Sequence, residues 1–96
     1  MLLGQVRELS FDQAERRIAR TLLNLAAQYG RPCPEAVRIS IRFTHQDVAG
    51  IINTSRITTN KVMKRMEEEG ILLKREGRYI LRALPALERL ARGEGQ

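Results

Sequence analysis

The 96-residue chain has few of the residues on which most enzymes and metalloproteins depend. It contains one cysteine, one histidine and no tryptophan. A lone cysteine excludes an internal disulfide, and no Cys/His spacing suggests a zinc site. The chain also lacks a glycine-rich phosphate loop and any grouping of a nucleophile with a base. We therefore expect no catalysis, no metal and no cofactor in this chain.

Long hydrophobic runs are missing as well. No apolar stretch approaches the roughly 18 residues that a membrane span requires. The opening Met-Leu-Leu-Gly is not followed by the apolar stretch of a signal peptide. We expect no membrane partner and a reducing, cytoplasmic location.

Positive charge is what the chain does have. Lysine and arginine number 17 against 11 aspartates and glutamates, which gives a formal charge of +6 and a pI near 10.4. Nucleic acid is the first partner to consider, and an anionic membrane the second. Charged groups that only solvate the surface explain the charge equally well. At this length the chain is one small domain.

The stretch that begins at Thr44 predicts two short helices joined by a tight turn. Thr44 is a good N-cap, and Asp47 three residues later makes a weak capping box. Asn53 stands where the chain must turn, and asparagine tolerates the left-handed region at low cost. Ser55 caps the second helix, which we expect over residues 56–69.

The faces of these two helices predict their roles. The first helix has an apolar stripe at Val48, Ile51 and Ile52. The second has a stripe with spacing i, i+3, i+4, i+7, formed by Thr59, Val62, Met63 and Met66. Its other face carries Arg56, Ile57, Asn60, Lys61 and Lys64. A packed stripe opposite a basic face is typical of a recognition helix in a major groove.

The flanking segments complete the fold. Ser10 and Gln13 form a capping box for a helix that reaches about Tyr29. Residues 30–36 are expected to be a loop, and residues 37–43 alternate as a half-buried strand.

Two short strands, at 71–75 and 78–82, flank Glu76-Gly77 and predict a hairpin. A last short helix starts at Pro85. The fold class is therefore α+β: a small winged helix-turn-helix with a three-helix core and a short β-hairpin wing.

The domain is expected at residues 10–92, with a disordered tail at 93–96. Residues 1–9 are too short to form a stable helix unless they dock on something. We expect them to be either the stub of a helix or a disordered N-terminus.

The run IRFTHQDVAGIINTSRITTNKVMKRMEEEGIL resembles the DNA-binding domain of the cyclic-AMP receptor protein and fumarate–nitrate regulator (Crp/Fnr) family of bacterial transcription factors. The upstream RIARTLLNLAAQYG resembles the helix that precedes the motif in that family. The match of upstream helix, turn, second helix and wing, in order, is far more specific than a helix-turn-helix alone.

The resemblance implies a sequence-specific transcription regulator that binds a partly palindromic double-stranded DNA operator as a homodimer. It implies that residues 1–9 are the remnant of a dimerisation helix, that RNA polymerase is a further partner, and that any effector-binding domain lies outside these residues. The chain alone is expected to be a monomer or weak dimer off DNA. The alternative is a winged helix used as a protein-interaction module without sequence-specific DNA binding.

The resemblance also assigns residues. Base reading falls on Arg56, Ile57, Asn60 and Lys61. Phosphate contacts fall on Thr44, His45, Gln46, Thr54, Ser55 and Thr58. The basic charge of Lys64 on the second helix and of Lys74, Arg75 and Arg78 in the hairpin suits further phosphate contacts. Two alternatives stay open: His45 as an exposed residue without a role, and the wing cations as charges that only protect a sheet edge.

The sequence departs from the family at the reading positions. Arg56 matches the residue that reads guanine, but Ile57 replaces the usual glutamate and Lys61 the usual arginine. Asn60 stands where serine or glycine is common. The half-site preferred by well-known relatives is therefore not expected here.

Overall fold

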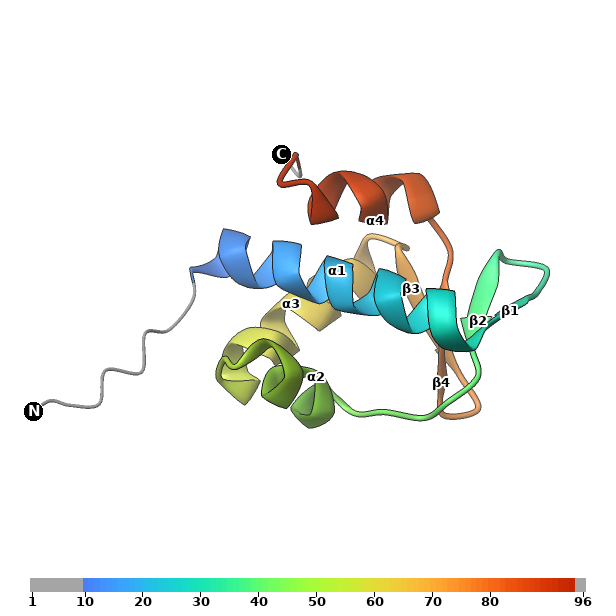
Figure 1. The fold of residues 1–96 in the computed structure, drawn as a ribbon, viewed down its shortest axis with the longest axis horizontal. Coiled ribbons are helices and arrows are strands. Elements are labelled where there is room, and N and C mark those ends of the chain that lie inside the picture. The colour runs from blue at the N-terminus through green and yellow to red at the C-terminus, as the bar shows by residue number, and fades with distance from the viewer. Residues whose placement is uncertain (1–9, 95–96) are drawn as a thin grey trace, which may run out of the picture.

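A computed structural model describes residues 10–94 of the chain (Figure 1). Its elements in order are α1 (Phe11–Tyr29), β1 (Gly30–Pro32), β2 (Val37–Ile39), α2 (His45–Ile52), α3 (Arg56–Glu68), β3 (Leu72–Arg75), β4 (Arg78–Leu81) and α4 (Leu84–Ala91). Residues 1–9, for which a dimerisation-helix remnant or disorder was predicted, lie outside the described residues, as do 95–96.

Helix α1 begins with the predicted capping box. The Gln13 N–H donates to Ser10 Oγ at 3.1 Å, and the Ser10 N–H donates to Gln13 Oε1 at 3.0 Å. The helix ends at Tyr29 because Gly30 takes an extended conformation and begins a strand. Its buried face includes one carboxylate, Glu15, whose pKa is raised by burial and partly lowered by the nearby Arg65.

The sheet is larger than the sequence predicted. Four antiparallel strands lie in the order β1-β2-β4-β3. The prediction of a loop over residues 30–36 is wrong at its start, because residues 30–32 pair with β2. The strand predicted over 37–43 ends at Ile39. The next carbonyl, that of Ser40, accepts a hydrogen bond from the Arg78 guanidinium instead of continuing the ladder with β4.

The helix-turn-helix forms where it was predicted. The Asp47 N–H donates to Thr44 Oγ1 at 3.1 Å, and the Thr44 N–H donates to Asp47 Oδ2 at 2.8 Å. Asn53 closes α2 in the left-handed region, with φ 59° and ψ 53°. Ser55 then caps α3 by accepting the Thr58 N–H at 3.1 Å.

One residue of the predicted α2 stripe is wrongly assigned. Ile51 is 61% exposed, whereas Val48, Ala49 and Ile52 are buried. The buried face of α2 is thus centred on spacing i, i+1, i+4, which places Ile51 on the solvent side of this short helix.

The predicted wing and last helix are both present. Strands β3 and β4 pair from Leu72↔Leu81 to Arg75↔Arg78. The two residues between them, Glu76 and Gly77, both have positive φ, as a hairpin of the type I′ class requires. Helix α4 lies against α1, and the Arg20 Nε–H donates to the Ala91 carbonyl at 3.0 Å.

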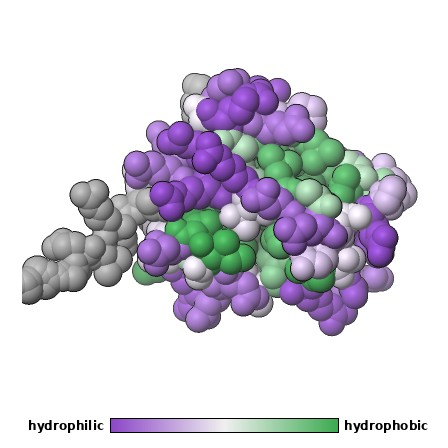
Figure 2. Space-filling model, in the orientation of Figure 1, coloured by the Kyte–Doolittle hydropathy of each residue, from purple (hydrophilic) through white to green (hydrophobic). Residues whose placement is uncertain are grey.

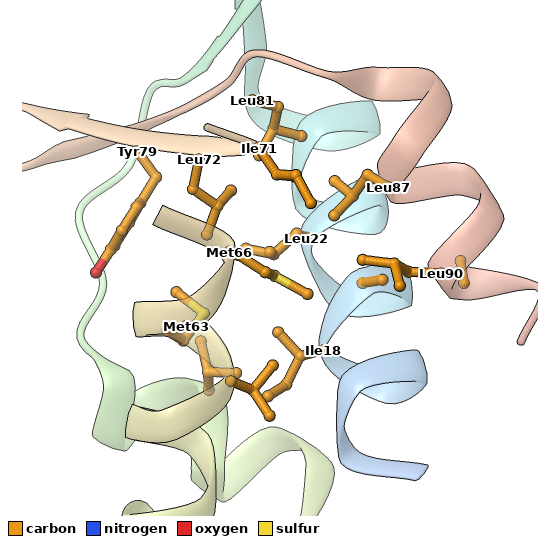
Figure 3. Close-up of a cluster of buried hydrophobic side chains, with 14 of the residues drawn as sticks. Ile18, Leu22, Met63, Met66, Ile71, Leu72, Tyr79, Leu81, Leu87 and Leu90 are labelled. Carbon is orange, nitrogen blue, oxygen red and sulfur yellow. The ribbon is translucent and has the colours of Figure 1, made fainter. Parts of the chain in front are cut away.

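The core joins α1, α3, β3, β4 and α4, as Figure 3 shows, and it includes Ile39 of β2 and Val48 and Ile52 of α2. Met63 and Met66 of α3 meet side chains of α1, of β3 and β4, and of α4. The labelled buried residues are Ile18, Leu22, Met63, Met66, Ile71, Leu72, Tyr79, Leu81, Leu87 and Leu90. The α+β winged helix-turn-helix class is confirmed, with α4 and the additional strands β1 and β2 packed beside the three-helix core.

The surface is mixed. Figure 2 shows the face in front, where α1 crosses before α3, as mostly hydrophilic with separate hydrophobic areas. Apolar atoms on the surface are expected of a small domain, which cannot cover itself with polar groups. Among the described residues, no helix is both long enough and apolar enough to cross a membrane.

Two glycines provide a matched test of the packing. A Cβ on Gly30 would lie 2.3 Å from the Ala26 carbonyl oxygen and 2.8 Å from Val37 Cγ1, whereas one on Gly50 would meet nothing within 4 Å. We predict that Gly30→Ala lowers the free energy of unfolding by about 1–3 kcal/mol through overpacking. Gly50→Ala should raise it by about 0.5–1 kcal/mol, because alanine favours the helix.

Urea unfolding followed by circular dichroism measures both changes in the free energy of unfolding. Equal stability of the two variants would contradict the close approach of β1 to the end of α1.

Candidate nucleic-acid interface

The position of α3 is set by its buried stripe. Thr59, Val62, Met63 and Met66 are all buried, as their spacing predicted. The opposite side of α3 is therefore turned to solvent. It carries the four predicted reading residues and Lys64, all exposed: Arg56, Ile57, Asn60, Lys61 and Lys64. Ile57 is 68% exposed, so it is not a core residue.

The start of α2 lies beside this face. His45 is the first residue of α2, and its Nδ1 lies 2.7 Å from Asn60 Oδ1 on α3. Its Nε2 lies 3.9 Å from Glu67 Oε2, and its ring stacks on Tyr79 with 6.3 Å between centroids. Both ring nitrogens of His45 thus face groups of α3. These contacts tie the start of α2 to α3.

The predicted phosphate-binding hydroxyls are partly occupied by local hydrogen bonds. Thr44 Oγ1 and Ser55 Oγ each accept a capping N–H, and Ser55 Oγ also lies 3.1 Å from Thr58 Oγ1. Thr54 Oγ1, in the turn, is buried without a partner among the described residues. The first N–H groups of α2, at His45 and Gln46, have no carbonyl within their own helix. Such a helix N-terminus suits an anion.

The wing cations are tied to neighbouring groups. Arg75 Nη1 lies 2.8 Å from Glu35 Oε2, and the half-buried Arg78 donates from Nε to the Ser40 carbonyl at 2.8 Å. Lys74 Nζ stands 5.3 Å from the centroid of the Tyr79 ring. Burial of that ring raises the pKa of the Tyr79 phenol to about 12. The wing is therefore tied to the β1–β2 loop through Arg75 and to the end of β2 through Arg78.

Comparison with known proteins identifies this arrangement. Residues 16–90 match the Crp-like helix-turn-helix domain. The chain belongs to this family. The Crp-like helix-turn-helix is a sequence-specific DNA-binding domain of transcription regulators.

Three similar proteins illustrate the relationship. The CRP-like cAMP-activated global transcriptional regulator of Mycobacterium tuberculosis H37Rv is 32% identical over 89 residues, which are 93% of this chain and 38% of that protein. The cAMP-activated global transcriptional regulator CRP of Haemophilus influenzae is 33% identical over 72 residues, which are 71% of this chain and 30% of that protein. The solved catabolite activator protein of Thermus thermophilus is 30% identical, with a TM-score of 0.71, over 88% of this chain and 36% of that one.

The similarity covers only part of each of these relatives. The chain spans between 30% and 38% of the length of these relatives. What it shares with them is the Crp-like DNA-binding domain.

Two residues near the wing were missed in the sequence. The Arg42 guanidinium lies against the wing tip, where a Cβ on Gly77 would be 3.2 Å from its Nε. Glu35 binds Arg75 from the β1–β2 loop. Arg42 was read only as a polar position in an alternating strand, and Glu35 only as part of a proline-containing loop. Neither pattern carries a signal for a contact across the sheet.

The Arg75–Glu35 contact can be tested without DNA. The hydrogen bond from the Arg75 guanidinium holds the pKa of the Glu35 carboxyl below its usual range. We predict that Arg75→Gln raises the Glu35 pKa towards the ordinary glutamate value, because the cationic donor is lost.

NMR titration of the Glu35 side-chain carboxyl carbon measures this pKa. Lys74→Gln, in the neighbouring wing position, serves as the control and should leave it nearly unchanged. An identical Glu35 pKa in wild type and Arg75→Gln would mean that the ion pair does not persist in solution.

Proposed function

We propose that this chain is the DNA-reading part of a Crp-like transcription regulator and lays the exposed side of α3 in a major groove. The proposal rests on the exposure of Ile57 beside Arg56. The first two turns of α3 turn a bidentate donor and an apolar group outward, while the opposite stripe is fully packed. A helix of this kind fits the width of the B-DNA major groove.

We assign base reading to Arg56, Ile57, Asn60 and Lys61. Arg56 stands at the first position of α3, and an arginine there can donate two parallel hydrogen bonds to guanine O6 and N7. Ile57 cannot accept a hydrogen bond, so it cannot read cytosine N4 as a glutamate would. Its natural partner is the thymine 5-methyl group.

Positioning on the phosphates falls to three groups around α3. The first group is the N-terminus of α2 with its cap, which comprises Thr44, His45 and Gln46. The second is the turn and the flank of α3, which comprise Thr54, Ser55, Thr58 and Lys64. The third is the wing, with Lys74, Arg75 and Arg78, and to it we add Arg42 because its guanidinium lies at the wing tip. Phosphate contacts of this kind fix register but carry no sequence information.

Two such domains would bind a partly palindromic operator as a homodimer, with half-sites about 34–36 Å apart, one helical turn of DNA. RNA polymerase is the further partner that regulation would require. We assign no catalytic role to the described residues, place any effector binding outside this chain, and expect the protein to act in the cytoplasm. If this chain prefers no DNA sequence, the alternative function is a winged helix that serves as a protein-interaction module.

The first test concerns Arg56. We predict that Arg56→Ala weakens binding to the preferred site by about 1–3 kcal/mol and relaxes the preference at one guanine, because two hydrogen bonds to that base are lost. The preferred site comes from selection of bound duplexes out of a random pool, and the affinity from fluorescence anisotropy at fixed salt.

Arg89→Ala is the control, because it removes the same charge from an exposed position on α4. If Arg56→Ala binds every sequence more weakly while its base preference stays intact, Arg56 is a phosphate contact. If wild type itself selects no sequence, the protein-interaction reading takes the place of DNA reading.

The second test concerns Ile57. Replacing the thymine that it reads by uracil deletes one methyl group and should weaken wild type by on the order of 1 kcal/mol. Ile57→Ala should bind the two duplexes almost equally, because the side chain that covers the methyl is gone.

Ile51→Ala provides the matched control. It truncates another isoleucine of similar exposure, 61% against 68%, but on α2. It should respond to uracil as wild type does. Equal losses for wild type and Ile57→Ala would show that Ile57 does not read the methyl group.

A further inference from the structure

The contact between His45 and Asn60 joins a predicted phosphate residue to a predicted reading residue. Their side chains come from different helices, with Nδ1 of the ring 2.7 Å from Oδ1 of the amide. An amide oxygen can only accept a hydrogen bond, so the Nδ1 atom must carry a proton. The neutral ring protonated at Nδ1 and the doubly protonated ring both satisfy this requirement.

The surroundings of the ring support this arrangement. Its other nitrogen, Nε2, is 3.9 Å from the Glu67 carboxylate, and its face stacks on Tyr79 at an interplanar angle of 28°. Tyr79 is buried, and its ring lies 5.0 Å from that of Phe43. The histidine ring is thus held by packed groups, and it in turn holds the amide of Asn60.

Holding the amide decides what Asn60 offers to DNA. A free asparagine pairs with adenine by two bonds: it accepts from N6 through its oxygen and donates to N7 through its nitrogen. Here one of the two lone pairs of the oxygen faces His45 Nδ1, and this bond fixes the orientation of the amide plane, which cannot turn to align both atoms with adenine unless the bond is given up. The NH₂ group, a donor, remains for the base edge.

We propose that His45 sets the base preference of Asn60: it binds the amide oxygen and turns the NH₂ group, a donor, to the base edge, which suits guanine O6 or N7 or thymine O4. His45 acts through Asn60 and is a positioning residue. The inference rests on the proposed DNA-reading function, and it adds the class of base edge that this position accepts.

The DNA experiment compares four proteins by selection from a random duplex pool: wild type, His45→Ala, His45→Asn and Asn60→Ala. Asn60→Ala identifies the base position that Asn60 reads. At that position wild type should favour guanine or thymine. His45→Ala should shift the preference towards adenine by about tenfold, the discrimination that a bidentate pair provides. His45→Asn should keep the wild-type preference, because its amide NH₂ can replace the Nδ1–H donor.

Each other result overturns the inference. The same preference in wild type and His45→Ala, with or without a uniform loss of affinity, would show that His45 acts only as a structural residue or a phosphate contact and does not orient Asn60. A wild-type preference for adenine or cytosine would show that the Asn60 oxygen faces the base. If wild type selects no sequence at all, both this inference and the proposed DNA-reading function fail. If wild type keeps a preference at the other base positions, only the inference about His45 and Asn60 fails.

A second measurement needs no DNA and no substitution. The ¹⁵N chemical shifts of the His45 ring in the free protein distinguish its protonation forms. A protonated Nδ1 near neutral pH is expected, with a coupling across the hydrogen bond to Asn60. A ring protonated only at Nε2 would overturn the proposal, even if His45→Ala does not fold.

Discussion

Burial of Met63 and Met66 against Ile18 and Leu22 of α1 determines which side of α3 faces solvent. The angle between neighbouring residues on a helix is fixed, so burying this stripe places Arg56 and Ile57 outside without any interaction of their own. The exposed face of α3 is thus a consequence of the core of this small domain, and a change in the packing of α1 would rotate the groups that we propose to read DNA.

Local hydrogen bonds then set where α3 begins. The caps at Thr44 and Ser55 and the left-handed Asn53 fix the ends of α2 and α3, and with them the angle between the two helices. The side chains that make these caps are short and polar, and Thr44 and Ser55 are among the residues to which we assign phosphate contacts. The same oxygen atoms can therefore stabilise the turn in the free protein and remain near the DNA backbone in a complex.

The sequence predicted what depends on local chemistry and on strong periodicity: the caps, the buried stripe of α3, the hairpin and the outward Ile57. The sequence did not predict the features that depend on packing or pairing between separate segments of the chain. Ile51 has the spacing of a buried residue, but packing against neighbouring helices selected Ala49 instead. Strand β1 exists because β2 pairs with it. The contacts of Glu35 with Arg75 and of His45 with Asn60 join segments far apart in the chain, and no pattern within either segment announces them.

The order of charges along α3 has a further consequence. Arg56 opens the helix, Lys61, Lys64 and Arg65 follow towards its last turn, and the exposed Glu67, Glu68 and Glu69 stand at its end. This order adds to the helix macrodipole instead of opposing it, and each such charge costs about 0.3–1 kcal/mol when it lies in a terminal turn. Helix α3 therefore gives up part of its own stability and relies on the core. In exchange its positive and negative charges are partly separated along its axis, which gives the helix an electric moment of its own.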